Sequence, residues 1–147
     1  GEPGDMMIGT SMTEADVSAL MLWPHTNICT DGSLLDRHPR GAGSFPKVLG
    51  GYVRDLGLLP LEQAIHKMTG LPAEHMGFTQ RGKVAEGYIA DLVLFDPATI
   101  IDRATTRAPH RLSEGVSDVW VGGERVLDRG VSNNAFPGRV LRRVGAN

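Results

Sequence analysis

Hydrophobic residues recur at helical spacing through the first half of the chain and in short extended runs through the second half. Thr13 precedes two acidic residues and an apolar stripe, which predicts a helix with Thr13 as its cap. Pro24 is expected to end this helix. Two more helices and one extra turn are predicted at 45–56 (followed by Gly57), 61–68 (followed by Gly70) and 71–76. Gly57 is expected to end its helix, and Gly70 stands where a left-handed cap residue is favoured.

The extended runs predict one strand in the helical half and several strands after it. The segment 25–29 is expected to form a short buried strand, and 90–95 is apolar enough for burial on both faces. Gly122 and Gly123 predict a two-residue hairpin turn, since paired glycines tolerate the positive φ angles that such turns require. The strands and surface segment around this turn are expected at 116–121, 124–127 and 131–143.

The character of the chain changes near Gly77, which divides it into 1–76 and 77–147. One strand among helices cannot form an independent α/β sheet, and the second part has too few strands to hide its sheet edges easily. Either the helices pack directly on the small sheet as an α+β domain, or both parts complete larger structures contributed elsewhere. We favour the second arrangement.

Composition and charge exclude several classes of protein. Among 147 residues, 41% are hydrophobic, and a net charge of −2 provides no basic field for nucleic acid or anionic membrane surfaces. No apolar run is long enough to span a membrane. The single cysteine, Cys29, excludes an internal disulfide and paired-cysteine zinc motifs, and it suits a reducing cytoplasm, where we expect the protein. Gly1 is no initiator methionine, so we expect a longer parent chain.

The strongest candidate for chemistry is Asp31, which follows the predicted strand at 25–29 in a glycine-flanked loop. Catalytic groups of α/β barrels lie at the carboxyl ends of strands. From the pattern alone, however, an aspartate before a glycine is more often a turn residue. The five histidines are scattered without a His-x-His or His-Glu-x-x-His motif, so the chain has no recognisable complete zinc site.

Several segments together resemble the carboxyl-terminal part of metal-dependent amidohydrolases, most closely the N-acyl-D-amino-acid deacylase (D-aminoacylase) branch. The resemblance runs almost from end to end. The phrase Gly87-Tyr88-Ile89-Ala90-Asp91-Leu92-Val93 is common to many amidohydrolases and identifies only the superfamily. The phrase that joins Asp31 to the His38-Pro39-Arg40 loop and Phe45-Pro46 points to the deacylase branch. The other segments that carry the resemblance are Trp23-Pro24-His25-Thr26, Cys29-Thr30-Asp31-Gly32, Gly43-Ser44-Phe45-Pro46 and Lys67-Met68-Thr69-Gly70-Leu71-Pro72-Ala73.

This resemblance implies an α/β fold in which 1–76 forms the last part of a TIM-like (β/α)8 barrel and 77–147 the carboxyl-terminal part of a small composite β-sandwich. It implies zinc in the full-length enzyme, with ligands mostly outside this chain, and a missing N-terminal barrel portion or self-association as partner. The substrate would be a small N-acyl-D-amino acid, with Asp31 as catalytic base and then acid. The residues implied to contact this substrate are Thr30, Gly32, Ser33, His38 and Arg40. His38 and Arg40 can equally brace the loop.

Alternatives stay open at this point. The chain can be a non-catalytic, truncated interaction module in which Asp31 is a turn residue, or part of a cyclic amidohydrolase such as a dihydroorotase or hydantoinase. Cys29 is interpreted as a small buried hydrophobic residue. Asp91 and Asp96 are interpreted as turn caps, and His110 has no functional case.

Overall fold

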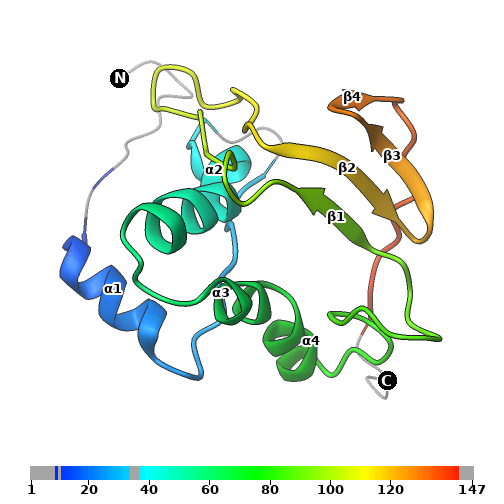
Figure 1. Cartoon of the computed structure of the whole chain (residues 1–147), viewed down its shortest axis with the longest axis horizontal. Coiled ribbons are helices and arrows are strands. Elements are labelled where there is room, and N and C mark those ends of the chain that lie inside the picture. The colour runs from blue at the N-terminus through cyan, green and yellow to red at the C-terminus, as the bar shows by residue number, and fades with distance from the viewer. Residues whose placement is uncertain (1–8, 10, 34–36, 143–147) are drawn as a thin grey trace, which may run out of the picture.

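The computed structural model describes residues 9, 11–33 and 37–142, with helices in one half of the molecule and an antiparallel sheet in the other (Figure 1). The helices are α1 (Glu14–Leu22), α2 (Arg40–Lys47), η1 (Val48–Asp55), α3 (Leu61–Met68) and α4 (Gly70–Met76). The strands are β1 (Leu92–Phe95), β2 (Val116–Val121), β3 (Glu124–Asp128) and β4 (Val131–Ser132). Within the described ranges, no helix is long and apolar enough to cross a membrane.

Helix α1 begins as its sequence predicts. The Thr13 hydroxyl accepts a hydrogen bond from the Asp16 amide at 3.2 Å, and the Asp16 carboxylate accepts one from the Thr13 amide at 2.9 Å. This reciprocal capping satisfies two amides that a helix start leaves open. The predicted helix is confirmed, and it ends at Leu22, just before Trp23 and Pro24.

The predicted helix at 45–56 is longer than its sequence pattern indicated. It starts five residues earlier, as α2 at Arg40, and continues as the π-helix η1 to Asp55. Pro46 lies inside α2 and has no N–H to donate to the Ala42 carbonyl four residues earlier. That carbonyl instead accepts a 3.0 Å hydrogen bond from the Ser113 hydroxyl, which links α2 to a loop far away in sequence.

The predicted helix at 61–68 is confirmed as α3, but the predicted role of Gly70 is wrong. Gly70 is the first residue of α4 and is buried. A Cβ atom there would lie 2.7 Å from Nδ1 of His66, so close packing accounts for this glycine. The left-handed cap residue is Gly77, at φ +70°, after the last turn of α4.

The hydrophobic core joins the helices to the start of the sheet. Its buried members are Val48, Leu49, Tyr52, Leu59, Ala64 and Ile100. Phe95 of β1 and Val116 of β2 pack against this cluster from the sheet side, and Ile28 packs on it from the segment after α1. The Tyr52 hydroxyl donates to the Glu14 carboxylate at 2.9 Å, which connects η1 to α1. Burial, reinforced by this carboxylate, raises the pKa of Tyr52 to about 12.

The strand predicted at 25–29 does not form. This segment instead contacts α3, where the Ile28 amide donates to the Lys67 carbonyl at 3.0 Å. A strand requires hydrogen-bonding neighbours on a sheet, and the described part of the chain supplies none beside this segment. For the same reason Cys29 is exposed, and its predicted burial is wrong.

The sheet has the order β1-β2-β3-β4, and all neighbouring strands are antiparallel. The predicted hairpin is confirmed: Gly122 and Gly123 connect β2 to β3 at φ +60° and +87°. The prediction that the strand at 90–95 is buried on both faces is wrong, because β1 is an edge strand. Val93 and Leu94 of β1 are 58% and 55% exposed.

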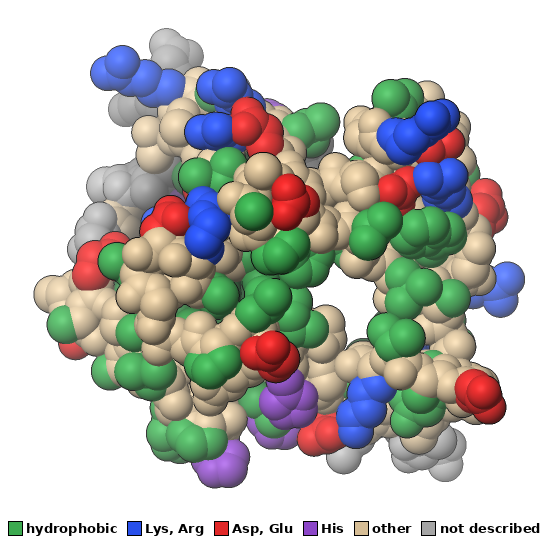
Figure 2. All heavy atoms as spheres, in the orientation of Figure 1, with side chains coloured by type: hydrophobic (Ala, Val, Ile, Leu, Met, Phe, Trp, Pro, Cys, Tyr) green, Lys and Arg blue, Asp and Glu red, His purple; other side chains and the backbone are tan. Residues whose placement is uncertain are grey.

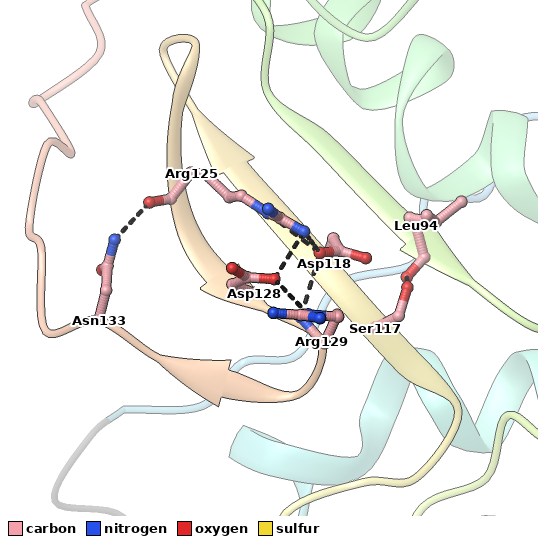
Figure 3. A network of polar contacts seen from close by, with 7 residues as sticks. All are labelled: Leu94, Ser117, Asp118, Arg125, Asp128, Arg129 and Asn133. Atoms are coloured by element: carbon pink, nitrogen blue, oxygen red, sulfur yellow. Dashed lines mark hydrogen bonds and ion pairs between the residues drawn. The ribbon is translucent and has the colours of Figure 1, made fainter.

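Local polar contacts fix the turns and the hairpin of the sheet. As predicted, Asp96 caps a turn, accepting from the Ala98 amide at 2.9 Å, and Asp91 accepts from the Gly122 amide at 2.8 Å. Asp118 of β2 is buried and is bound by the Arg125 guanidinium and the Arg129 amide (Figure 3). These hydrogen bonds, with Arg125 as the largest cause, lower the pKa of Asp118 to about 2.

Candidate active site

Asp31 lies on an exposed loop that follows the segment packed on α3. Its side chain is 80% exposed, and its backbone adopts φ +47°, a left-handed conformation that is uncommon for residues other than glycine. The next amide, that of Gly32, donates to the Thr30 hydroxyl at 3.3 Å. The loop therefore turns sharply at Asp31 and presents the carboxylate to the outside.

Arg40, the first residue of α2, forms an ion pair with Asp31. Its Nη1 lies 2.9 Å from Oδ2 of Asp31, and the arginine side chain is 40% exposed. The family resemblance implied that Arg40 contacts the substrate or braces the loop. The structure brings it to the carboxylate of Asp31, where it restricts the position of this side chain.

His38 contacts the start of α2. Its Nδ1 accepts a hydrogen bond from the Arg40 amide at 3.1 Å, so the imidazole occupies the place of a capping side chain. Since Nδ1 accepts, the proton of the neutral ring belongs on Nε2. His38 thus orders the residue that pairs with Asp31.

Gly32 and Gly41 allow the Asp31 loop to approach the first turn of α2 closely. A Cβ atom added to Gly32 would clash with the Cα atom of Gly41. Because any side chain at Gly32 would push the loop away from α2, this position requires glycine. The sequence predicted Gly32 as a substrate contact, and the structure adds a packing requirement.

A cavity of about 290 Å³ adjoins the loop on the side of Gly32, Ser33 and His38. Its other wall comes from the second half of the chain and includes Pro109, His110 and Leu112. The Ser113 hydroxyl, bound to α2, holds this wall in place. Sequence reasoning missed these residues because nothing in the local pattern around His110 relates it to a loop about 70 residues earlier.

Lys67 is a second residue that sequence reasoning missed. It is only 1% exposed, and burial lowers the pKa of its ammonium group. A signal was present, because Lys67 stands three residues after Ala64 and four before Leu71, in line with two buried apolar positions.

The described residues do not assemble a complete metal site. In 9, 11–33 and 37–142, no group of three or more histidine, cysteine, aspartate or glutamate side chains comes together. A catalytic zinc ion requires about three protein ligands. The donor groups among these described residues therefore do not fit a whole zinc centre, although the carboxylate of Asp31 is accessible.

The chain is similar to known amidohydrolases over most of its length. The model of the amidohydrolase family matches residues 25–127. D-aminoacylase from Alcaligenes xylosoxydans xylosoxydans is 46% identical over 137 residues, which cover 92% of this chain and 28% of the relative. The chain therefore spans little more than a quarter of the length of this curated relative.

Two solved structures share the fold. A D-aminoacylase structure with a binuclear metal centre matches with a TM-score of 0.85 and 48% identity, over 90% of this chain and 28% of that protein. N-acyl-D-glutamate deacylase from Bordetella bronchiseptica, solved with zinc and a phosphonate that mimics the tetrahedral intermediate, matches with a TM-score of 0.76 and 45% identity. That match covers 78% of this chain and 25% of the deacylase.

Proposed function

The chain belongs to the amidohydrolase family, and from that premise we propose that it is the carboxyl-terminal part of a zinc-dependent enzyme that hydrolyses the amide bond of N-acyl-D-amino acids. The observation that carries the proposal is the match of nine-tenths of this chain to D-aminoacylase in both sequence and fold. The products would be a carboxylate and a free D-amino acid. The chain has a single cysteine, Cys29, which is free and exposed. Because a free thiol suits a reducing compartment, a cytoplasmic location is part of the same proposal.

In this proposal, 1–76 completes a TIM-like barrel and 77–147 completes a composite β-sandwich. Three features support it. Asn27, on the segment that would be the last barrel strand, has a buried amide oxygen without a hydrogen-bond donor in the described structure. Strand β1 exposes apolar side chains at an open sheet edge. A hollow between the sheet and α3 is lined by hydrophobic side chains on both of these sides and by polar and charged side chains along its remaining edge (Figure 2). Each feature calls for further protein, since unpaired buried acceptors and exposed apolar faces are costly.

Zinc in the full-length enzyme would be held by ligands mostly outside this chain. It would lower the pKa of a bound water molecule and so provide the attacking nucleophile near neutral pH. The contribution of this chain is Asp31. A carboxylate beside the attacking water accepts its proton and then delivers that proton to the departing amine nitrogen, so that one group acts as base and then as acid. The exposed position of Asp31 leaves room for both transfers.

Arg40 and His38 would serve this chemistry in two ways. Arg40 holds the carboxylate of Asp31 in one orientation, and its planar guanidinium has further N–H donors suited to the carboxylate of an N-acyl amino acid. His38 fixes the main chain of Arg40. Thr30, Gly32 and Ser33 would shape the substrate site from the loop side.

The test is Asp31→Asn in the full-length enzyme, assayed with an N-acetyl-D-amino acid, its L-enantiomer and a cyclic amide such as dihydroorotate. We expect wild type to prefer the linear D-substrate, and the variant to retain zinc while kcat falls by about 10²–10⁴-fold. Asp55→Asn, which changes another exposed and ion-paired aspartate, is the control and should keep full activity. Near-normal turnover of Asp31→Asn would remove Asp31 from the mechanism, and a preference for the cyclic amide would change the substrate class.

A further inference from the structure

Lys67 is a buried ionisable group, in the helical half of the molecule, for which the proposed chemistry has no role. Lysine normally extends its ammonium group into water, because burying a charge without partners is costly. Here the whole residue is only 1% exposed, and it lies on α3 in the helical half of the molecule. Such a position requires hydrogen bonds that compensate for the lost hydration.

Those hydrogen bonds go to the main chain of the segment between α1 and the Asp31 loop. The Lys67 ammonium donates to the Trp23 carbonyl at 2.5 Å and to the Thr26 carbonyl at 3.3 Å. The Lys67 carbonyl accepts from the Ile28 amide at 3.0 Å. Among the described residues, no carboxylate pairs with this ammonium group. Lys67 therefore holds the segment from Trp23 to Ile28 through both its side-chain ammonium group and its main-chain carbonyl.

The segment that Lys67 holds has no regular secondary structure of its own. Between Trp23 and Thr30 the chain is neither helix nor strand, and it passes beside α3 on its way to the loop (Figure 1). Beyond Ile28, which packs on the core, Cys29 and Asp31 are exposed. The contacts with Lys67 are thus the last buried attachment before Asp31, and three residues of extended chain reach only about 10 Å.

We infer that Lys67 is a positioning residue, whose buried ammonium group fixes the main chain at Trp23 and Thr26 and thereby sets where Asp31 stands. The link to catalysis rests on the proposed function. The attachment of the segment to Lys67 is independent of the proposed function, because it concerns only the order of the main chain. Lys67→Met keeps most of the length of the side chain and removes the N–H donors that reach the Trp23 and Thr26 carbonyls.

The first experiment measures amide hydrogen exchange by NMR in the 147-residue chain, without any activity assay. In the unsubstituted chain, the Ile28 amide should be protected although it lies outside helices and strands. Lys67→Met should speed its exchange by about tenfold or more, through local opening, and leave the Leu58 amide unchanged. The matched control is Lys83→Met, since Lys83 is 56% exposed and pairs with Glu74 on the surface. Rapid exchange of Ile28 in the unsubstituted chain would overturn the inference, even if the Lys67 variant fails to fold.

The second experiment measures kcat and KM of Lys67→Met in the full-length enzyme. Misplacement of Asp31 should lower kcat by about 10–100-fold, with KM and zinc content little changed. Lys67→Arg, which retains N–H donors, should recover part of this loss. Unchanged kcat with rapid Ile28 exchange would overturn the positioning role. If wild type does not hydrolyse N-acyl-D-amino acids, the proposed function fails, while the exchange measurement still decides whether Lys67 holds the segment.

Discussion

Gly115 provides a sharp test of how the sheet is attached to the helical core. It stands immediately before β2 at φ +88°, and its carbonyl accepts from the Asp96 amide at 2.9 Å. A Cβ atom at Gly115 would lie 2.5 Å from both N and Cα of Ile100, which is a core residue with 1% exposure. Both are main-chain atoms, so the neighbour cannot relieve the clash by changing a rotamer.

The chain contains a matched control for this perturbation. Gly123, in the hairpin, has nearly the same φ, +87°, but a Cβ atom there would meet nothing within 4 Å. Alanine at either position carries the penalty of a left-handed backbone, about 1–2 kcal/mol. Only Gly115→Ala adds the cost of forcing apart packed main chains, about 1–3 kcal/mol.

We therefore expect Gly115→Ala to lower the free energy of unfolding by about 2–5 kcal/mol, and Gly123→Ala by about 1–2 kcal/mol. Urea denaturation followed by circular dichroism measures both, and a slope of about 1–3 kcal/mol per molar urea makes the difference visible in the midpoints. Equal midpoints for the two variants would refute the close approach of Gly115 to Ile100.

Three further predictions follow from the structure. Because the pKa of Tyr52 is raised, the contribution of its neutral hydroxyl to stability is fully present below pH 10 and is lost as pH rises from 10 towards 12. Urea midpoints measured across this range should show that loss in the unsubstituted chain and not in Tyr52→Phe. The lowered pKa of Asp118 has the opposite sign, so its contribution is present above pH 3.8 and is lost as pH falls towards 2, a step that should be absent in Asp118→Asn. The exposed apolar face of β1 should make the isolated chain self-associate or bind a hydrophobic dye, and a compact, dye-free monomer in light scattering would contradict that expectation.

Elements that depend on neighbours in sequence were predicted well. The capping of α1 by Thr13, the turn at Asp96 and the Gly122-Gly123 hairpin each use hydrogen bonds or backbone angles within a few residues. Local sequence contains all of the information that such interactions need. The resemblance of motifs likewise identified the family before any geometry was known, and the family match bears it out.

Features that depend on distant partners were predicted poorly. The segment 25–29 was predicted to be a buried strand, but a strand exists only where neighbouring strands share its hydrogen bonds. Strand β1 has the composition of a doubly buried strand, but its position at the sheet edge leaves it exposed. In both cases the sequence pattern indicates the surroundings that a segment suits, and the described part of the chain does not provide those surroundings.

The sequence by itself therefore determined the family, the capped start of α1, the tight turns and the choice of Asp31 as the leading candidate. Only the tertiary structure decided that Arg40 pairs with Asp31, that His110 lines the same cavity as His38, and that Lys67 is buried against the segment leading to the loop. The physical reason is the range of the interactions. Capping and turn formation act within a few residues of the chain, whereas these contacts form only after the packing of α2, α3 and the sheet has brought remote main chains together.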